Sequence, residues 1–201
     1  MICPKVYDKF MGTVMDEVDR KKLEFYIGNL LIKKPDNVPK YIAFYGSPGT
    51  GKSTILDLLA DIFEEQFSSI TNGLSDGDQF VLKIIKPRIV IAHDCNVNAV
   101  VKILEEQTDI PEYTRFIFAT NELPDQVNLP ITVLCMTGNR MSTAQYRDIH
   151  PCLKYLTYEY MCYCVDNLAY HRICGTNFYA DNRLLYNEED GMDSFIRILK
   201  D

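Results

Sequence analysis

The chain has 201 residues, 47% of them hydrophobic, so it can bury the core of one α/β domain with a small appendage. No apolar run reaches the roughly 18 residues that a membrane helix needs, and the N-terminal segment lacks the long apolar stretch of a secretory signal. Isolated nucleic-acid-binding domains are usually basic, whereas the net charge here is −7, so any DNA contact must come from a local patch or from the channel of an assembly.

The first part of the chain is predicted to alternate between helices and strands. Residues 1–15 read as an irregular lead-in. The segment 17–33 carries apolar residues at the spacing of one helix face: Leu23, Tyr26, Ile27, Leu30 and Leu31. The apolar run Tyr41–Tyr45 is typical of a strand buried on both faces. After a glycine-rich turn, a second helix repeats the helical spacing at Ile55, Leu58, Leu59, Ile62 and Phe63.

This alternation continues through the middle of the chain. Further strands are predicted at Phe80–Ile85, Ile89–Ala92, Phe116–Ala119 and Ile131–Cys135. Between the second and third of these, a helical stripe is formed by Val97, Val100, Val101 and Leu104. Because strands that alternate with helices form parallel sheets, the predicted fold class is α/β, with a parallel sheet sandwiched by helices.

The pattern changes after Thr143, and a domain boundary is predicted near Ser142. A helix starting at Pro151 would bury Leu153, Leu156, Tyr160 and Cys164. A terminal helix would bury Met192, Phe195, Ile196 and Leu199. We therefore predict an α/β core over residues 1–142 and a small helical domain over residues 143–201.

A glycine-rich motif separates the strand Tyr41–Tyr45 from the helix after it. It matches G-x-x-x-x-G-K-[ST] and, with one further residue, comprises Gly46, Ser47, Pro48, Gly49, Thr50, Gly51, Lys52, Ser53 and Thr54. Glycines let backbone N–H groups converge on phosphate oxygens, and the N-terminus of the following helix attracts the same anion. Lys52 is expected to reach the β- and γ-phosphates and Ser53 to ligate Mg²⁺. The motif thus predicts ATP and Mg²⁺ as cofactors; the flanking strand and helix disfavour the alternative, a chance glycine turn.

A second part of the predicted site follows the strand Ile89–Ala92. Phosphate-loop ATPases need a carboxylate for Mg²⁺ and usually another that orients the attacking water, but only Asp94 is present here. In one register Asp94 lies in the Mg²⁺ shell and Cys95 occupies the position of the base. In the other, His93 replaces the metal-side acid and Asp94 is the base. The alternative is that Asp94 only caps the next helix.

The strand Phe116–Ala119 is followed by a Thr-Asn pair that ends in Asn121. An amide beside the phosphate loop can face the γ-phosphate or the attacking water, because it offers both a donor and an acceptor. The alternative is an asparagine that only opens the next turn. We predict Asp94 and Asn121 as catalytic residues, and Ser53 and Asp94 as metal ligands.

Together these segments resemble AAA+ ATPases, in particular the ATPase subunits of clamp loaders. KYIAFYGSPGTGKSTI is similar to their first strand, phosphate loop and helix, and IVIAHDCN lies where they carry four apolar residues and an acidic pair. YTRFIFATN resembles their sensor-1 strand, with Asn121 as the sensor, and the resemblance covers roughly residues 10–137. Viral superfamily 3 replicative helicases are the rival family, since FIFATNELP is similar to their motif C; they normally carry a longer stretch, with a DNA-contacting hairpin, before that asparagine.

The sequence departs from the clamp-loader pattern at one further point. Clamp loaders carry a Ser-Arg-Cys segment whose arginine reaches the nucleotide of the neighbouring subunit. The matching stretch here, Val133–Cys135, lacks the arginine, and Arg140 is the nearest candidate. The resemblance implies a ring-forming homo- or hetero-oligomer, and the short, divergent chain favours a viral or phage origin.

Three functions compete on these observations. The first is an ATP-driven ring subunit in DNA replication, clamp-loader-like or helicase-like, with weak or partner-dependent hydrolysis. The second is a degenerate ATP-binding subunit with a structural or regulatory role, which is motivated by His93, Cys95 and Leu134. The third is a small-molecule or nucleotide kinase, whose phosphate loop would be similar; such enzymes close an arginine-rich lid, and no tight arginine cluster follows Gly77.

Cysteines and tyrosines gather in the last third of the chain. Seven cysteines without a secretory signal predict reduced thiols and a cytoplasmic or nuclear location, not secretion. If the segment after Pro151 is helical, Cys162 and Cys164 point about 200° apart, so buried thiols are expected rather than a zinc site. A set of tyrosines is expected to pack in the core or at a subunit contact, not to stack on bases: Tyr155, Tyr158, Tyr160, Tyr163 and Tyr170.

Overall fold

A computed structural model describes residues 2–32, 38–63, 85–93, 95–106, 110–123, 129–176, 178–179 and 184–185. The chain divides into two compact units, each made of three separate segments. The helical unit comprises Met1–Val38, Gly46–Glu64 and Cys135–Asp181. The sheet unit comprises Pro39–Tyr45, Glu65–Leu134 and Asn182–Asp201.

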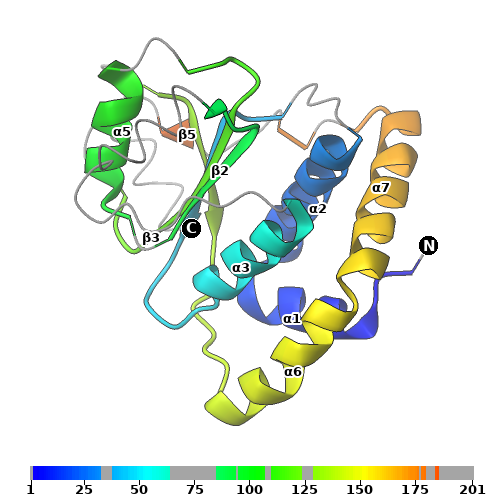
Figure 1. Cartoon of the computed structure of the whole chain (residues 1–201). Coiled ribbons are helices and arrows are strands. Elements are labelled where there is room, and N and C mark those ends of the chain that lie inside the picture. Colours follow the sequence, from blue (N-terminus) through cyan, green and yellow to red (C-terminus); the bar gives the residue numbers. More distant parts are fainter. Residues whose placement is uncertain are drawn as a thin grey trace. The chain divides into compact units, whose positions relative to one another are not determined.

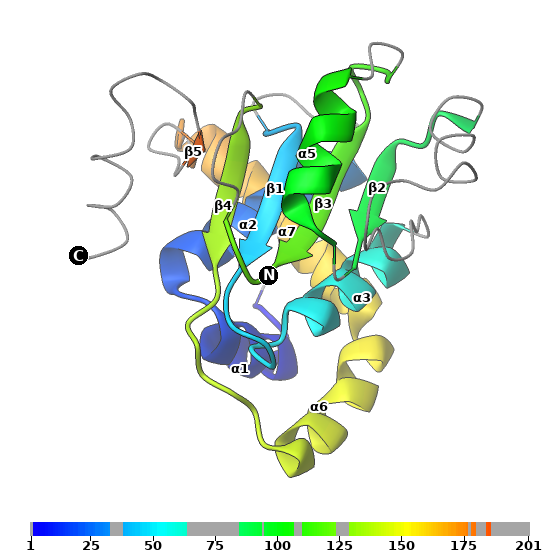
Figure 2. The same cartoon turned by 90° about the vertical axis from the view of Figure 1, so that its left-hand side faces the viewer.

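The sheet unit contains a mainly parallel sheet with the strand order β2-β3-β1-β4-β5. Its strands are β1 (Tyr41–Tyr45), β2 (Ile89–Ala92), β3 (Arg115–Thr120), β4 (Ile131–Cys135) and β5 (Leu184–Leu185). The four longer strands run in the same direction, as Figure 2 shows, and the two-residue β5 pairs antiparallel with β4. Helix α5 (Val97–Glu106) lies over one face of this sheet. The prediction of an α/β fold with a parallel sheet is therefore confirmed.

The four longer strands form because each is mostly apolar and almost entirely buried, as a sheet buried on both faces requires. Ile42, Phe44 and Phe118 are among the fully buried side chains. The register sets Tyr45, at the end of β1, opposite Thr120, at the end of β3. The carboxyl ends of these two strands therefore lie side by side.

The helices that the structure describes in the helical unit form one cluster in Figure 1. They are α1 (Lys5–Val14), α2 (Glu17–Leu31), α3 (Lys52–Phe63), α6 (Thr143–Tyr155) and α7 (Thr157–Ile173). Helices α2 and α7 pack along each other, α1 contacts α6, and α3 contacts both α6 and α7. The unit thus brings together three parts of the chain that are far apart in sequence.

Close helix contacts fix this cluster. A Cβ atom added to Gly28 of α2 would lie only 2.5 Å from the carbonyl oxygen of Cys164 in α7, so only glycine permits this approach. The ring of Tyr7 in α1 stacks on that of Tyr160 with centroids 4.0 Å apart, and its hydroxyl donates to the carbonyl oxygen of Leu153 at 2.7 Å. Besides these helix contacts, the carboxylate of Asp19 in α2 accepts from the backbone N–H of Cys135, the first residue of the third segment of this unit, at 2.7 Å.

The predicted irregular lead-in over residues 1–15 is wrong, because most of it is helix α1. Its buried residues are Tyr7, Phe10, Met11 and Val14, at the helical spacing i, i+3, i+4, i+7. The helix also carries Gly12 near its end, outside this stripe. Burial against other helices stabilises it.

The helix predicted to start at Pro151 begins earlier, at Thr143, and Pro151 lies inside it. Ser142 and Gln145 form a capping box, in which the Ser142 hydroxyl accepts from the backbone of Gln145 at 3.3 Å and the Gln145 side chain accepts from the backbone of Ser142 at 2.9 Å. The first turns are mostly exposed, so they carry no apolar stripe. The helix also ends at Tyr155 and a separate helix, α7, follows.

Some sequence predictions fall on other parts of the chain. Most of the predicted strand Phe80–Ile85 and all of the terminal helix lie outside the described residues. The domain boundary near Ser142 stays a prediction. Among the helices that the structure describes, none is long and apolar enough to cross a membrane.

Candidate functional site

The glycine-rich motif forms a loop that leaves β1 at Tyr45 and enters α3 at Lys52. Gly49 and Gly51 adopt left-handed backbone angles, with φ of +80° and +98°. Residues with a side chain rarely adopt such angles, so these two motif positions require glycine. Ser47, Pro48 and Gly49 are exposed, which leaves the tip of the loop open to solvent.

The base of the loop rests on two apolar side chains from distant parts of the chain. A Cβ atom on Gly46 would lie 2.7 Å from Cβ of Met136, and one on Gly51 would lie 2.9 Å from Cγ1 of Val14. Within the loop, the hydroxyl of Thr50 donates to the carbonyl oxygen of Ser47 at 2.8 Å. The loop is therefore held in shape by close packing below it and by a hydrogen bond across it.

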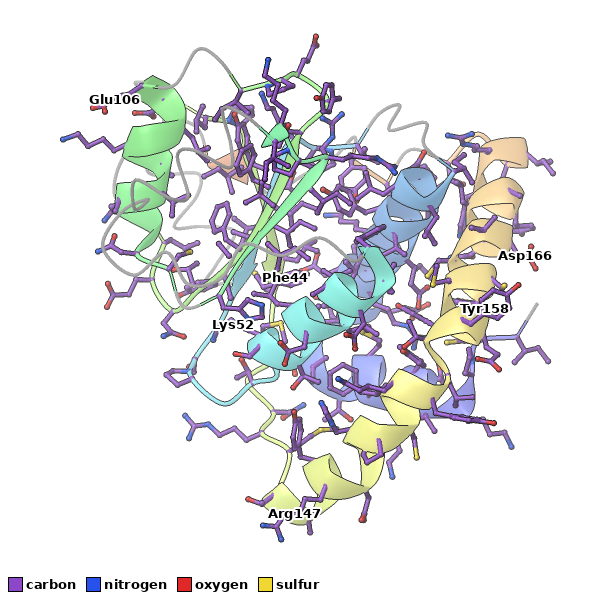
Figure 3. All side chains as sticks on the ribbon, in the orientation of Figure 1. Phe44, Lys52, Glu106, Arg147, Tyr158 and Asp166 are labelled. Atoms are coloured by element: carbon purple, nitrogen blue, oxygen red, sulfur yellow. The ribbon has the colours of Figure 1, made fainter. Side chains whose placement is uncertain are left out.

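Lys52 begins α3 with its side chain folded onto the loop (Figure 3). Its ammonium donates to the carbonyl oxygens of Gly46 at 2.6 Å and of Ser47 at 2.8 Å. Only 7% of the residue is exposed. The ammonium group of Lys52 is thus held at the loop and does not extend into solvent.

The first turn of α3 presents further polar groups next to the loop. The first α-helical hydrogen bond runs from the N–H of Ile55 to the carbonyl oxygen of Gly51 at 3.1 Å, so the N–H groups of residues 52–54 stand outside the helical ladder. Ser53 is exposed, whereas Thr54 is buried. The Ser53 hydroxyl is therefore accessible to a metal ion.

The segment after β2 is described only in part, because Asp94 lies outside the described residues. Cys95 is buried, and its thiol donates to the carbonyl oxygen of Ala119 in β3 at 3.4 Å. The side chain of Asn96 accepts from the N–H of Ala99 at 3.2 Å, so Asn96 caps α5. The helix cap that was the alternative role for Asp94 is thus supplied by Asn96.

Asn121 lies exposed directly after β3. The hydroxyl of Thr120 bonds to both backbone groups of Glu122, accepting from its N–H at 3.1 Å and donating to its carbonyl oxygen. This local turn fixes the backbone on both sides of Asn121. Thr120 pairs with Tyr45 in the sheet. Asn121 directly follows Thr120, and the phosphate loop directly follows Tyr45.

Arg140 lies on the phosphate loop of its own chain, a placement that the sequence did not predict. A Cβ atom on Gly49 would be 3.8 Å from both Cδ and Nε of Arg140. The sequence singled out Arg140 only as a candidate for reaching a neighbouring subunit. No sequence signal indicated this contact, or the packing of Val14 and Met136 under the loop, because all three depend on the tertiary fold.

The tyrosines of the last third divide into two groups. Tyr160 is fully buried, and the hydroxyl of Tyr163 bonds to Glu24 at 3.1 Å. The expectation of core packing is wrong for Tyr155, Tyr158 and Tyr170, which are 84%, 72% and 62% exposed. Their part in a subunit contact stays a prediction.

Cys162 and Cys164 both lie on helix α7. Cys164 is buried and Cys162 is partly exposed. Burial raises the pKa of the Cys164 thiol well above its ordinary value. This thiol therefore stays protonated at neutral pH.

Comparison with known proteins identifies the fold alone. No protein-family model and no curated protein matches the sequence significantly. Solved structures of the C-terminal region of NrS-1 are similar in fold. The A-form apo structure has a TM-score of 0.58 and 19% identity, over 80% of this chain and 45% of that chain. A second A-form apo structure, of residues 305–718, has a TM-score of 0.53 and 17% identity, over 78% and 44%. This chain thus spans less than half the length of these NrS-1 chains.

Proposed function

We propose that this chain binds ATP with Mg²⁺ at Gly46–Thr54 and acts as an AAA+-like P-loop ATPase subunit in DNA replication. The observation that carries nucleotide binding is the geometry of the loop. Its tip is exposed, two glycines hold left-handed angles, and the ammonium of Lys52 lies 2.6 and 2.8 Å from loop carbonyl oxygens. A cation and several backbone N–H groups beside an open loop make a site for an anion with many oxygens.

In this proposal each group has a distinct task. Lys52 exchanges the two carbonyl oxygens for oxygens of the β- and γ-phosphates. Ser53 ligates Mg²⁺, which neutralises part of the phosphate charge, and the N-terminus of α3 contributes its positive dipole end. Binding therefore uses groups that are already close to the loop.

The sheet supports the assignment of the remaining site residues. Ligands of open α/β proteins bind outside the carboxyl ends of the parallel strands. The phosphate loop follows β1, Asn121 follows β3, and Asp94 lies two residues after the end of β2. We propose that Asn121 faces the γ-phosphate or the attacking water, and that Asp94 serves Mg²⁺ or the water.

The role in DNA replication rests on the resemblance of the sequence to clamp-loader ATPases and superfamily 3 helicases. The proposal includes a ring-forming homo- or hetero-oligomer, contact with DNA through a local patch or within the assembly, and a cytoplasmic or nuclear location. A viral or phage origin fits the short, divergent chain. The similarity to NrS-1 supports the fold and adds no activity.

A degenerate ATP-binding subunit is the second candidate function, and the environment of Cys95 favours it. In one register this residue occupies the position of the catalytic base. Its thiol is buried and donates to the carbonyl oxygen of Ala119, so it does not face an attacking water. In that register ATP would bind without efficient hydrolysis.

The test of nucleotide binding is the affinity for MgATP of the wild type and of Lys52→Ala, measured by calorimetry. Loss of a charged ligand to two phosphates should weaken binding at least about 100-fold. Lys9→Ala, which removes an exposed lysine of α1, is the matched control and should leave the affinity unchanged. Because Lys52 also bonds two loop carbonyls, the melting temperature of each variant is recorded. An affinity of Lys52→Ala within threefold of wild type would mean that the loop is not the site.

A further inference from the structure

The side chain of Arg140 lies along the tip of the phosphate loop in the same chain. Both belong to the helical unit. Cδ and Nε of Arg140 are each 3.8 Å from the position that a Cβ atom of Gly49 would occupy, which is ordinary van der Waals distance. Arg140 and Gly49 are both exposed. The guanidinium therefore lies at the open side of the loop, where a bound phosphate chain would be accessible to it.

The segment that carries Arg140 is fixed to helix α1 just before the arginine. The backbone N–H of Thr137 donates to the carbonyl oxygen of Val14 at 2.9 Å, and its hydroxyl donates to the carbonyl oxygen of Thr13 at 2.7 Å. Met136 forms a β-bridge with the residue after α1 and packs against the first glycine of the motif. The contact of Arg140 with the loop thus follows from an anchored backbone.

The charge of Arg140 has no acidic partner among the residues that the structure describes. Arg20, by contrast, contacts Asp8 and Glu24, each at 2.8 Å. A guanidinium offers planar donors that match phosphate oxygens in pairs. Arg140 and the ammonium of Lys52 are therefore two cations on one anion-binding loop, and only Lys52 is occupied by loop carbonyls.

We propose that Arg140 contacts the phosphates of the nucleotide bound to its own chain. This inference rests on the proposed function, since it requires a nucleotide on the loop. It also assigns Arg140 a role different from that of the clamp-loader arginine, which reaches the nucleotide of the neighbouring subunit. An arginine placed at its own loop contributes to nucleotide affinity in every chain, whether or not a neighbour is bound.

The first measurement is the affinity for MgATP of Arg140→Ala, Arg140→Lys and Arg147→Ala. Arg140→Ala should bind at least about tenfold more weakly, as expected when a hydrogen bond to a charged group is lost. Arg140→Lys should be intermediate, because it keeps the charge without the planar donor pair. Arg147 is an exposed arginine on α6 (Figure 3), so Arg147→Ala makes the same change in net charge and should bind as wild type.

A mixing experiment separates action within a chain from action on a neighbour. Chains with Arg140→Ala keep Lys52, and chains with Lys52→Ala keep Arg140. If Arg140 serves its own loop, an equimolar mixture of the two should bind MgATP no more tightly than Arg140→Ala alone. Restoration of wild-type affinity in the mixture would show that the arginine acts on a neighbouring chain, and would overturn the proposal.

Two further results would overturn it as well: wild-type affinity in Arg140→Ala, or an equal loss in Arg147→Ala. Thermal melting of Arg140→Ala checks that the exposed substitution leaves the fold intact. If Lys52→Ala loses ATP while Arg140→Ala keeps it, only this inference fails. If wild type does not bind MgATP, or binds it no better than Lys52→Ala, the proposed function fails and this inference fails with it.

Discussion

Gly51 and Gly138 have similar left-handed backbone angles, with φ of +98° and +77°, but different surroundings. A Cβ atom on Gly51 would lie 2.9 Å from Cγ1 of Val14, whereas one on Gly138 would meet nothing within 4 Å. Alanine at either position carries the left-handed strain of about 1–2 kcal/mol. Gly51→Ala adds overpacking of about 1–3 kcal/mol. Denaturant unfolding should therefore show a larger loss of stability for Gly51→Ala than for Gly138→Ala, together with weaker MgATP binding.

The double variant Val14→Ala, Gly51→Ala tests the cause of that difference. Removing Cγ1 of Val14 removes the clash, so the two substitutions should be less destabilising together than the sum of their separate effects. Strict additivity of the two changes in unfolding free energy would contradict the packing argument.

The sequence was sufficient to predict a glycine loop between β1 and α3, because the motif is local, whereas the binding role of its residues stays a prediction. It was not sufficient to predict the place of Arg140, or that Val14 and Met136 support the loop. These residues are separated from the motif by dozens of positions, and neither periodicity nor spacing reports which distant segments meet. The roles of Asp94 and Asn121 stay predictions.

Helices α1 and α2 each carry one glycine near their C-terminal end, and the two glycines should respond in opposite ways to alanine. Alanine favours a helix by up to about 1 kcal/mol over glycine. Gly12 of α1 has nothing within 4 Å of its missing Cβ, so Gly12→Ala should stabilise the protein by about that amount. Gly28 of α2 faces the carbonyl oxygen of Cys164 at 2.5 Å, so Gly28→Ala should destabilise it by about 1–3 kcal/mol.

Urea titrations of these two variants and the wild type provide the measurement. Stabilisation by Gly28→Ala would mean that α2 and α7 do not approach each other this closely. A loss of stability in Gly12→Ala would contradict the open surroundings of that residue.

Most elements with an apolar run or a helical stripe were predicted well, but α1 and the start of α6 were not. The strands β1 to β4 and helices α2, α3 and α5 follow from short, mostly apolar runs or from helical stripes. Helix α1 was missed although its buried residues have the same spacing as the stripe of α5, and the first turns of α6 were missed because they are exposed. For α6 the capping box at Ser142 was the available signal, and Pro151 misled the prediction because proline usually marks the start of a helix.

The whole molecule is expected to bind ATP but to hydrolyse it slowly when alone, well below the roughly 1–10³ s⁻¹ of ordinary enzymes. An arginine supplied to a neighbouring site contributes on the order of 10³–10⁵ in rate. Leu134 stands where clamp loaders carry this arginine, and it is fully buried on β4. In the segment directly after β2, His93–Asn96, Asp94 is the only carboxylate. Both losses remove transition-state stabilisation and leave the phosphate contacts of the ground state.

Steady-state phosphate release, measured alone and with single-stranded or primed DNA, tests this expectation. Lys52→Ala serves as the control for contaminating ATPases. Fast release by the protein alone would contradict the expected loss of transition-state stabilisation. Fast release only with DNA or a partner chain would indicate that another subunit completes the site.

The helical unit is assembled from segments that leave the ribosome at very different times. Helices α1 and α2 lie within Met1–Val38, but the helices that cover them lie within Cys135–Asp181. About a hundred residues separate these segments, so at roughly 5–20 residues per second the first helices wait roughly 5–20 s for their partners. During that interval side chains such as Tyr7 and Phe10 lack the later helices of the folded unit. Nascent chains stalled before residue 135 should therefore recruit chaperones and resist native folding, whatever the state of the sheet.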